Sequence, residues 1–161
     1  MLEASQILHS SSRYRLTYTP RRSDFVVVTF DHWVRGKKAF EERAGGGGLY
    51  EKRGWSQLHV ASAANDWFLA PEMDDVISSA RQAASSHART ITCGYSMGAC
   101  AALKFAGALN ARRAVAISPQ FAVDPAAVPW EDRWSQDRRM LPWQREVFDA
   151  VAAACCDAVL V

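Results

Sequence analysis

The stretch Thr90-Ile-Thr-Cys-Gly-Tyr-Ser-Met-Gly98 is followed by a run of small residues and ends in the pattern Gly-x-Ser-x-Gly. Its first residues are mostly β-branched and predict a strand, whereas the alanine-rich run after it predicts a helix. A serine held on so tight a turn has a strained backbone, so the positions two before and two after it must lack bulky side chains. Gly94 and Gly98 meet this demand. The stretch therefore predicts a strand, a sharp turn and a helix, with the Ser96 hydroxyl at the carboxyl edge of a sheet.

Strand and helix patterns alternate on both sides of this turn. The continuous apolar run Phe25–Phe30 is typical of a strand covered on both faces, and residues 71–87 repeat apolar side chains at helical spacing. We expect further strands at 57–61, 114–117 and 157–161, and a helix from Met97 to Leu109. Such alternation favours parallel strands joined by right-handed crossovers. The sequence therefore predicts an α/β fold, a three-layer sandwich with a mostly parallel sheet flanked by helices, in a single domain of residues 1–161.

Other segments are less regular. Residues 1–12 form a polar lead, and Tyr14–Tyr18 alternates apolar and polar side chains as an edge strand does. The four glycines at 45–48 predict a mobile loop, because no phosphate-binding fingerprint surrounds them. Residues 121–143, which are rich in proline and tryptophan, are expected to form either a cap over the serine or a long loop on the core. A helix should follow from about Pro142 to Ala154.

With the strands and helices around it, the Gly94–Gly98 motif resembles the nucleophile elbow of the α/β-hydrolase superfamily, over about Phe25 to Val161. The resemblance implies acyl transfer: the serine attacks an ester-type carbonyl, a histidine takes and returns the proton, and an acid orients the histidine. More loosely, three further segments resemble bacterial hydrolase-like proteins associated with surface glycans. These segments are Asn65-Asp66-Trp67, Pro71-Glu72-Met73 and Ser118-Pro119-Gln120. The implied function is that of a serine hydrolase or acyltransferase acting on a small-molecule or glycan-linked acyl group.

The resemblance implies a role for several residues near the turn. Ser96 would be the nucleophile, and the Met97 N–H at the helix start would be the first oxyanion donor. The second donor is expected in the loop after the strand Phe25–Phe30, where we assign it to His32. The side chains expected to line the substrate pocket are Tyr95, Trp33, Asp66 and Trp67.

The rest of a catalytic triad is hard to find in this sequence. In the superfamily the acid and then the histidine follow the serine along the chain. Here all four histidines, His9, His32, His59 and His87, precede Ser96. Of the later acids, Asp124 and Asp157 read as ordinary surface carboxylates. The simplest interpretation is that the chain is truncated at its C-terminus. In two others, His32 or His59 reaches Ser96 from an unusual position, or the domain is a non-catalytic module that binds a glycan or a protein partner.

Composition narrows the class of protein. With 161 residues, 49% of them hydrophobic and 22% charged, the chain is too apolar for a disordered protein. The 19 basic and 17 acidic residues nearly balance, which argues against a nucleic-acid partner. The cysteines at 93, 100, 155 and 156 follow no metal-binding spacing, and we expect reduced thiols, no metal and no organic cofactor. Because neither a signal sequence nor a membrane span is apparent, we expect a cytoplasmic protein.

Overall fold

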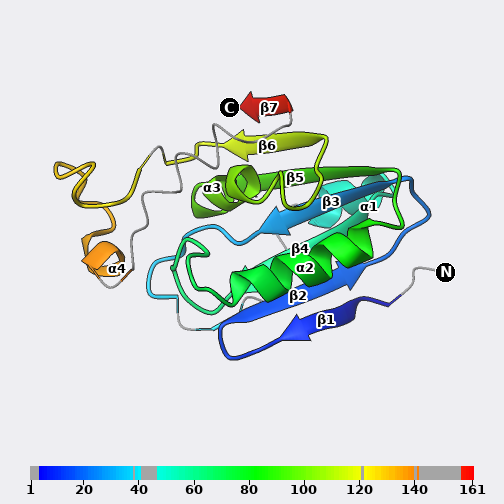
Figure 1. Ribbon diagram of the computed structural model, residues 1–161, viewed down its shortest axis with the longest axis horizontal. Helices are drawn as coiled ribbons and strands as arrows, with labels where there is room; N and C mark the ends of the chain where they lie inside the picture. Colours follow the sequence, from blue (N-terminus) through cyan, green and yellow to red (C-terminus); the bar gives the residue numbers. More distant parts are fainter. Residues whose placement is uncertain (1–3, 38, 41–46, 121, 140, 142–156) are drawn as a thin grey trace.

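A seven-stranded sheet with the strand order β1-β2-β4-β3-β5-β6-β7 forms the centre of the computed structural model (Figure 1). The structure describes residues 4–37, 39–40, 47–120, 122–139, 141 and 157–161. The strands are β1 (Gln6–Ser10), β2 (Tyr14–Thr19), β3 (Phe25–Phe30), β4 (Ser56–Ser62), β5 (Arg89–Tyr95), β6 (Arg113–Ile117) and β7 (Asp157–Leu160). The helices are α1 (Gly47–Lys52), α2 (Met73–Ala84), α3 (Met97–Lys104) and α4 (Ser135–Arg139).

The strands β4, β3, β5, β6 and β7 are parallel to their neighbours in this part of the sheet, whereas the pairs β1–β2 and β2–β4 are antiparallel. The carboxyl ends of the parallel strands therefore lie on one edge of the sheet, on the left in Figure 1. That edge carries both Asp31, directly after β3, and Ser96, directly after β5. The α4 segment lies beyond the same edge.

Helices cover both faces of the sheet, as neighbouring residues of β5 demonstrate. Thr92 faces α3, because its hydroxyl donates to the carbonyl of Ala102 at 2.8 Å. Cys93 points to the other face, where burial and the hydrogen bond with this thiol raise the pKa of Tyr50 in α1. The helix α2 packs beside α3 on the first face, where both contribute to one apolar core. The predicted α/β three-layer sandwich is thereby confirmed.

Aromatic side chains tie the sheet to the helices on the α2 and α3 face. Phe30, at the end of β3, lies with its ring centroid 5.9 Å from that of Phe105 and 5.5 Å from that of Phe68. All three are buried. Each fully buried side chain of this size contributes roughly 1.5–3 kcal/mol, so the strand that leads to the loop after β3 is held firmly.

Several local expectations are wrong. The edge strand is β1, inside the polar lead, and not Tyr14–Tyr18, because β2 pairs with β1 on one side and β4 on the other. Gly47 and Gly48 begin α1 and do not belong to a mobile loop. The helix after Ser96 ends at Lys104, five residues early, because the chain turns at Phe105 and reaches φ 51° at Asn110. Gly45, Gly46, the helix expected at 142–154, Cys155 and Cys156 lie outside the described residues.

Candidate functional site

Ser96 occupies the turn between β5 and α3 with φ 49° and ψ −119°, in the left-handed half of backbone space that a side chain seldom adopts. The surrounding chain enforces this conformation. The Ser96 amide donates to the carbonyl of Ile117 at 2.9 Å, and the Ser96 carbonyl accepts from the amide of Ala99 at 2.9 Å. Strain of this kind persists only where the neighbouring structure imposes it, and it occurs most often at functional sites.

The two glycines of the motif are required by contact with backbone atoms. A Cβ built on Gly94 would overlap the carbonyl of Gly98. A Cβ built on Gly98 would lie 2.5 Å from the carbonyl oxygen of Phe30 and 2.8 Å from that of Asp31. The start of α3 is therefore in direct contact with the loop after β3. This contact brings the backbone of that loop close to Ser96.

Two backbone regions can donate hydrogen bonds to an oxyanion beside Ser96. Met97 is the first residue of α3, and amides at the first turn of a helix have no intrahelical partner. In the loop after β3, the Asp31 amide already donates to the carbonyl of Val60 at 3.1 Å. His32 and Trp33 follow it directly, so their amides are the ones that this loop can offer to a developing negative charge.

A buried polar cluster anchors that loop. The carboxylate of Asp31, whose side chain is 4% exposed, accepts from Lys37 Nζ at 2.5 Å and His59 Nε2 at 3.1 Å. It also accepts from the amide of Ser62 at 3.0 Å. Although burial raises the pKa of this carboxyl, the bonds from His59 and Lys37 outweigh it and hold the pKa below its usual value. Asp31 is therefore a fixed anion beneath the loop that contacts Gly98.

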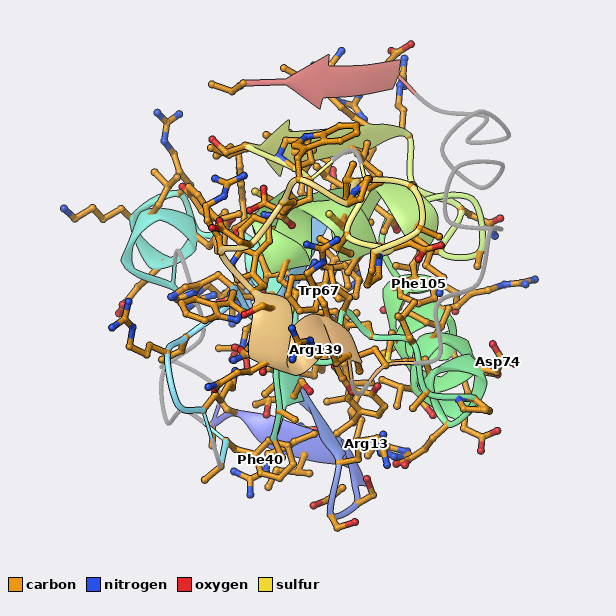
Figure 2. The ribbon with its side chains drawn as sticks, turned by 90° about the vertical axis from the view of Figure 1, so that its left-hand side faces the viewer. Arg13, Phe40, Trp67, Asp74, Phe105 and Arg139 are labelled. Carbon is orange, nitrogen blue, oxygen red and sulfur yellow. The ribbon has the colours of Figure 1, made fainter. Side chains whose placement is uncertain are left out.

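A cavity of about 460 Å³ opens beside Ser96, between the loop after β6 and the α4 segment. Its lining residues are Ser96, Ser118, Pro119, Gln120, Ala122, Val128, Glu131, Arg133 and Trp134. Five of these residues belong to the segment 122–139, which we call the cap. In Figure 2, which looks onto this edge of the sheet, α4 lies in front with Trp67 beside it.

The cap carries an ion pair into the cavity. Arg133 binds Glu131 through two nitrogens and lies over the ring of Trp134, 4.5 Å from its centroid. The hydrogen bonds from Arg133 lower the pKa of Glu131 to about 2. A carboxylate with so low a pKa is a poor proton acceptor at neutral pH, so Glu131 is unsuited to act as the base for Ser96.

Gln120 makes the direct side-chain contact with Ser96. Its Nε2 donates to Ser96 Oγ at 2.7 Å, while its Oε1 accepts from Trp67 Nε1 at 3.2 Å and from Cys100 Sγ at 3.2 Å. Sequence reasoning quoted Gln120 within a family resemblance but did not assign it to the site. Its position three residues past Ile117, the last residue of β6, was the available signal, because parallel strands end at the same edge.

The residues expected to line the pocket are spread around the site. Trp67 is linked to Ser96 by a hydrogen bond to Gln120. Its ring also packs edge-on against Trp134, with ring centroids 5.9 Å apart. Trp33 donates from Nε1 to Asp137 in α4 at 2.7 Å, which fixes the cap to the loop after β3. Tyr95, beside the serine, is 52% exposed.

The carboxylate of Asp66 is hydrogen-bonded to residues outside the Gly94–Gly98 motif. It accepts from the hydroxyl of Tyr14 at 2.5 Å, from Ser62 Oγ at 3.0 Å and from the amide of Phe68 at 3.1 Å. The side chain is buried, and burial together with the neighbouring carboxylate raises the pKa of Tyr14. These bonds give Asp66 the role of closing the loop after β4, in which Trp67 and Phe68 both have positive φ.

The histidines differ in their access to the serine. Both ring nitrogens of His59 are engaged, Nδ1 with Thr29 Oγ1 at 2.9 Å and Nε2 with Asp31, so His59 is not the base for Ser96. His32 lies at the carboxyl edge and is exposed. The remaining two contact other partners: His9 pairs with Glu72 at 3.3 Å, and His87 contacts Tyr18 at 3.3 Å.

Asp124 and Asp157, the acids considered above for a catalytic triad, are surface groups. Asp157 begins β7 opposite Arg113, at the amino edge of the sheet, and its carboxylate is 3.7 Å from that guanidinium. Asp124 accepts from the amide of Ala126 within a local turn of the cap. Neither contacts a histidine through any bond in the described residues, which agrees with their assignment as ordinary surface carboxylates.

Among the residues that the structure describes, no three His, Cys, Asp or Glu side chains gather into a group that could hold a metal ion. Within the described ranges, none of the helices has both the length and the apolar character that crossing a membrane requires.

Comparison with known proteins identifies the fold. No family model matches the sequence, and no curated protein gives a significant match. Solved structures do match. The esterase Pf2001 of Pyrococcus furiosus superposes with a TM-score of 0.62 at 14% identity, over 99% of this chain and 69% of that one. The fluorophosphonate-binding serine hydrolase FphF of Staphylococcus aureus gives 0.58 at 10% identity, over 98% of this chain and 77% of that one.

A third match is an acyltransferase. The capsule O-acetyltransferase of Neisseria meningitidis serogroup A superposes with a TM-score of 0.58 at 15% identity, over 88% of this chain and 62% of that one. At such identities the likeness establishes the fold. The chain has the α/β-hydrolase fold, as the Gly94–Gly98 motif and its flanking elements predicted.

Proposed function

We propose that this chain carries the nucleophile of an acyl-transfer site, in which Ser96 attacks an ester-type carbonyl. The observation that supports the proposal most strongly is the backbone of Ser96, strained at φ 49° between β5 and α3 and closed in by Gly94 and Gly98. A conformation that costs about 1–3 kcal/mol is retained only with a compensating benefit, and exposure of a nucleophile at a helix start is such a benefit.

The proposed reaction has two steps. In the first, Ser96 Oγ bonds to the acyl carbon, the hydroxyl proton passes to an imidazole base, and the carbonyl electron pair moves onto an oxygen held by the amides of Met97 and His32. The carbonyl then re-forms, and the alcohol leaves with the proton returned by the base. In the second step, water or an acceptor hydroxyl attacks the acyl-enzyme and releases Ser96.

The imidazole base has two proposed sources. His32 lies at the carboxyl edge of the sheet, the same edge as Ser96, whereas His9, His59 and His87 contact other residues. The alternative source is a histidine that does not belong to this chain.

We further propose a glycan hydroxyl or a glycan ester as the partner of the acyl group. The cavity beside Ser96 is lined by an arginine, a carboxylate and the edge of Trp134, a combination suited to a polar ring. The Neisseria meningitidis structure with this fold is named as a capsule O-acetyltransferase, and residues 65–67, 71–73 and 118–120 resemble glycan-associated proteins.

A second candidate function is a non-catalytic module that binds a glycan or a protein partner. It is favoured by one observation: among the described residues, no histidine or carboxylate is hydrogen-bonded to Ser96, whose recorded side-chain partner is the amide of Gln120. A serine without a base is a weak nucleophile.

Trapping the acyl-enzyme separates the two functions. The chain, its Ser96→Ala variant and its His32→Ala variant are incubated with 4-nitrophenyl acetate and digested, and peptides are analysed by mass spectrometry. Acyl transfer predicts one acetyl group on the peptide that carries residue 96 in the unmodified chain, and none there in Ser96→Ala. Loss of acetylation in His32→Ala, restored by added imidazole, would identify His32 as the base. Equal acetylation of several surface serines and lysines would support the binding module.

A further inference from the structure

We propose that Gln120 is a positioning residue that fixes the donor and acceptor directions of the Ser96 hydroxyl. The inference rests on the proposed acyl-transfer function and adds to it a residue that sets how the nucleophile points. It is carried by a chain of hydrogen bonds that runs from Trp67 and Cys100 through Gln120 to Ser96.

The orientation of the Gln120 amide follows from the chemistry of its partners. The indole nitrogen of Trp67 can only donate, so the atom 3.2 Å from it must be the amide oxygen. Burial raises the pKa of Cys100 to about 11, so this thiol keeps its one proton, which faces both the same amide oxygen at 3.2 Å and the backbone carbonyl of Gln120 at 3.3 Å. The NH₂ group of Gln120 must therefore face Ser96, 2.7 Å from Oγ.

This orientation determines what the serine can do. Because Gln120 presents only N–H groups to Oγ, the serine oxygen accepts this bond and its own proton must point elsewhere. The cavity is the open direction, and a base reaching Ser96 through the cavity would find the proton directed toward it. The same N–H remains in place to stabilise negative charge on Oγ when the proton leaves and when the acyl group departs.

The residues of this hydrogen-bond chain come from three parts of the fold. Trp67 belongs to the loop after β4 and is 3% exposed, Cys100 lies in α3, and Gln120 itself follows β6. Trp134 of the cap packs on the other side of Trp67. Gln120 thus has little freedom to turn, and a movement of the cap would reach Ser96 through Trp67 and this amide.

A first experiment tests the contact without requiring any reactivity. The side-chain amide of Gln120 is assigned in a ¹⁵N spectrum by its disappearance in Gln120→Met, and its exchange with water is measured in the unmodified chain and in Ser96→Ala. We expect exchange to be about five- to ten-fold faster in Ser96→Ala, the effect of losing one hydrogen bond. Ser78→Ala, at an exposed serine of α2, is the control and should leave the exchange rate unchanged. Equal exchange in the unmodified chain and Ser96→Ala would overturn the proposal.

A second experiment tests the positioning role. A fluorophosphonate is reacted with the unmodified chain, with Gln120→Met, and with Gln82→Met as the matched substitution at an exposed glutamine of α2. Gln120→Met should lower the maximal labelling rate at Ser96 about ten-fold while leaving the half-saturating probe concentration unchanged, because the residue orients the nucleophile and does not bind the probe. An unchanged maximal rate in a folded Gln120→Met would overturn the positioning role.

The two experiments separate this inference from the proposed function. If Ser96 in the unmodified chain stays unlabelled even with imidazole present, the acyl-transfer function fails, and the exchange measurement still decides whether Gln120 holds Ser96. If Ser96 is labelled, but Ser96→Ala does not change the exchange of the Gln120 amide and Gln120→Met does not change the labelling rate, the function stands and the inference fails.

Discussion

Gly94 and Gly98 lie on either side of Ser96 with so little space between them that a Cβ on Gly94 would overlap the Gly98 carbonyl group. The clash is with backbone, which cannot rotate away as a flexible side chain could. Gly94→Ala and Gly98→Ala are therefore each expected to destabilise the fold by about 3 kcal/mol or more. Gly107→Ala is the control, because a Cβ there meets nothing within 4 Å, and it should change stability by less than about 0.5 kcal/mol. Urea unfolding measures all three, and a Gly94→Ala variant as stable as Gly107→Ala would contradict the geometry.

The strain at Ser96 predicts a variant more stable than the natural sequence. Glycine adopts φ near 49° without the cost that a side chain incurs, so Ser96→Gly should gain about 1 kcal/mol or more in free energy of unfolding. Ser96→Ala keeps the Cβ and with it the strain, and it loses the hydrogen bond from Gln120 as Ser96→Gly does, so it is the matched reference for the effect of the strain. The two variants are compared by thermal unfolding. If Ser96→Gly is no more stable than Ser96→Ala, the turn is not strained.

The Asp31 cluster predicts a dependence of stability on pH. Hydrogen bonds from His59 and Lys37 hold the pKa of Asp31 below its unfolded value despite burial. The stabilisation is therefore complete above the usual aspartate pKa of about 3.9 and is lost as the pH falls through the lower folded pKa. Asp31→Asn should cost about 3–5 kcal/mol at pH 7, because Lys37 is left buried without its anion.

Unfolding of Asp31→Asn at a series of pH values checks this expectation. The difference from the unmodified chain should shrink as the pH falls below about 4. Asp74→Asn, at an exposed carboxylate of α2, serves as the control and should cost less than about 1 kcal/mol at pH 7. A difference for Asp31→Asn that stays constant into acid would mean that its charge does not anchor the loop.

Turnover of simple esters by this chain alone is expected to be low. Of the described residues, none with a suitable pKa is bonded to Ser96, and an oxyanion site without its base retains only about 10³–10⁴-fold acceleration over water. Above the rate at which imidazole alone hydrolyses the ester, added imidazole should give a saturable increase in the unmodified chain and none in Ser96→Ala. Rapid hydrolysis of 4-nitrophenyl acetate without imidazole, abolished by Ser96→Ala but unaffected by His32→Ala, would show that a base has been overlooked.

The features that could be predicted from sequence are those determined by neighbours along the chain. The turn at Gly94–Gly98 is recognisable because its steric demand falls on residues two positions apart. The central position of Phe25–Phe30 follows from a run of apolar residues too long for a half-exposed strand. In both cases the local pattern carries the physical constraint, and the α/β architecture follows from the order of such segments.

The features that were missed depend on contacts between distant segments. Gln120 reaches Ser96 because β6 ends beside β5, and nothing within residues 118–120 marks the amide as a partner of that serine. The pairing of Asp31 with His59 likewise joins the end of β3 to the middle of β4, and it removed His59 from the candidate bases. The cap was left between two alternatives because its position is set by Trp33 and Asp137, which are 104 residues apart.

Fluorophosphonate labelling tests whether the strained turn between β5 and α3 makes Ser96 a reactive nucleophile. The chain is reacted with the probe with and without imidazole, and the modified residue is located by mass spectrometry. Ser118 is the internal reference, because it lines the same cavity but does not begin a long helix. We expect labelling of Ser96 to be at least about ten-fold faster than labelling of Ser118, to be accelerated by imidazole and to be absent at position 96 in Ser96→Ala. Equal labelling of Ser96 and Ser118, or none at Ser96 with imidazole present, would contradict this expectation.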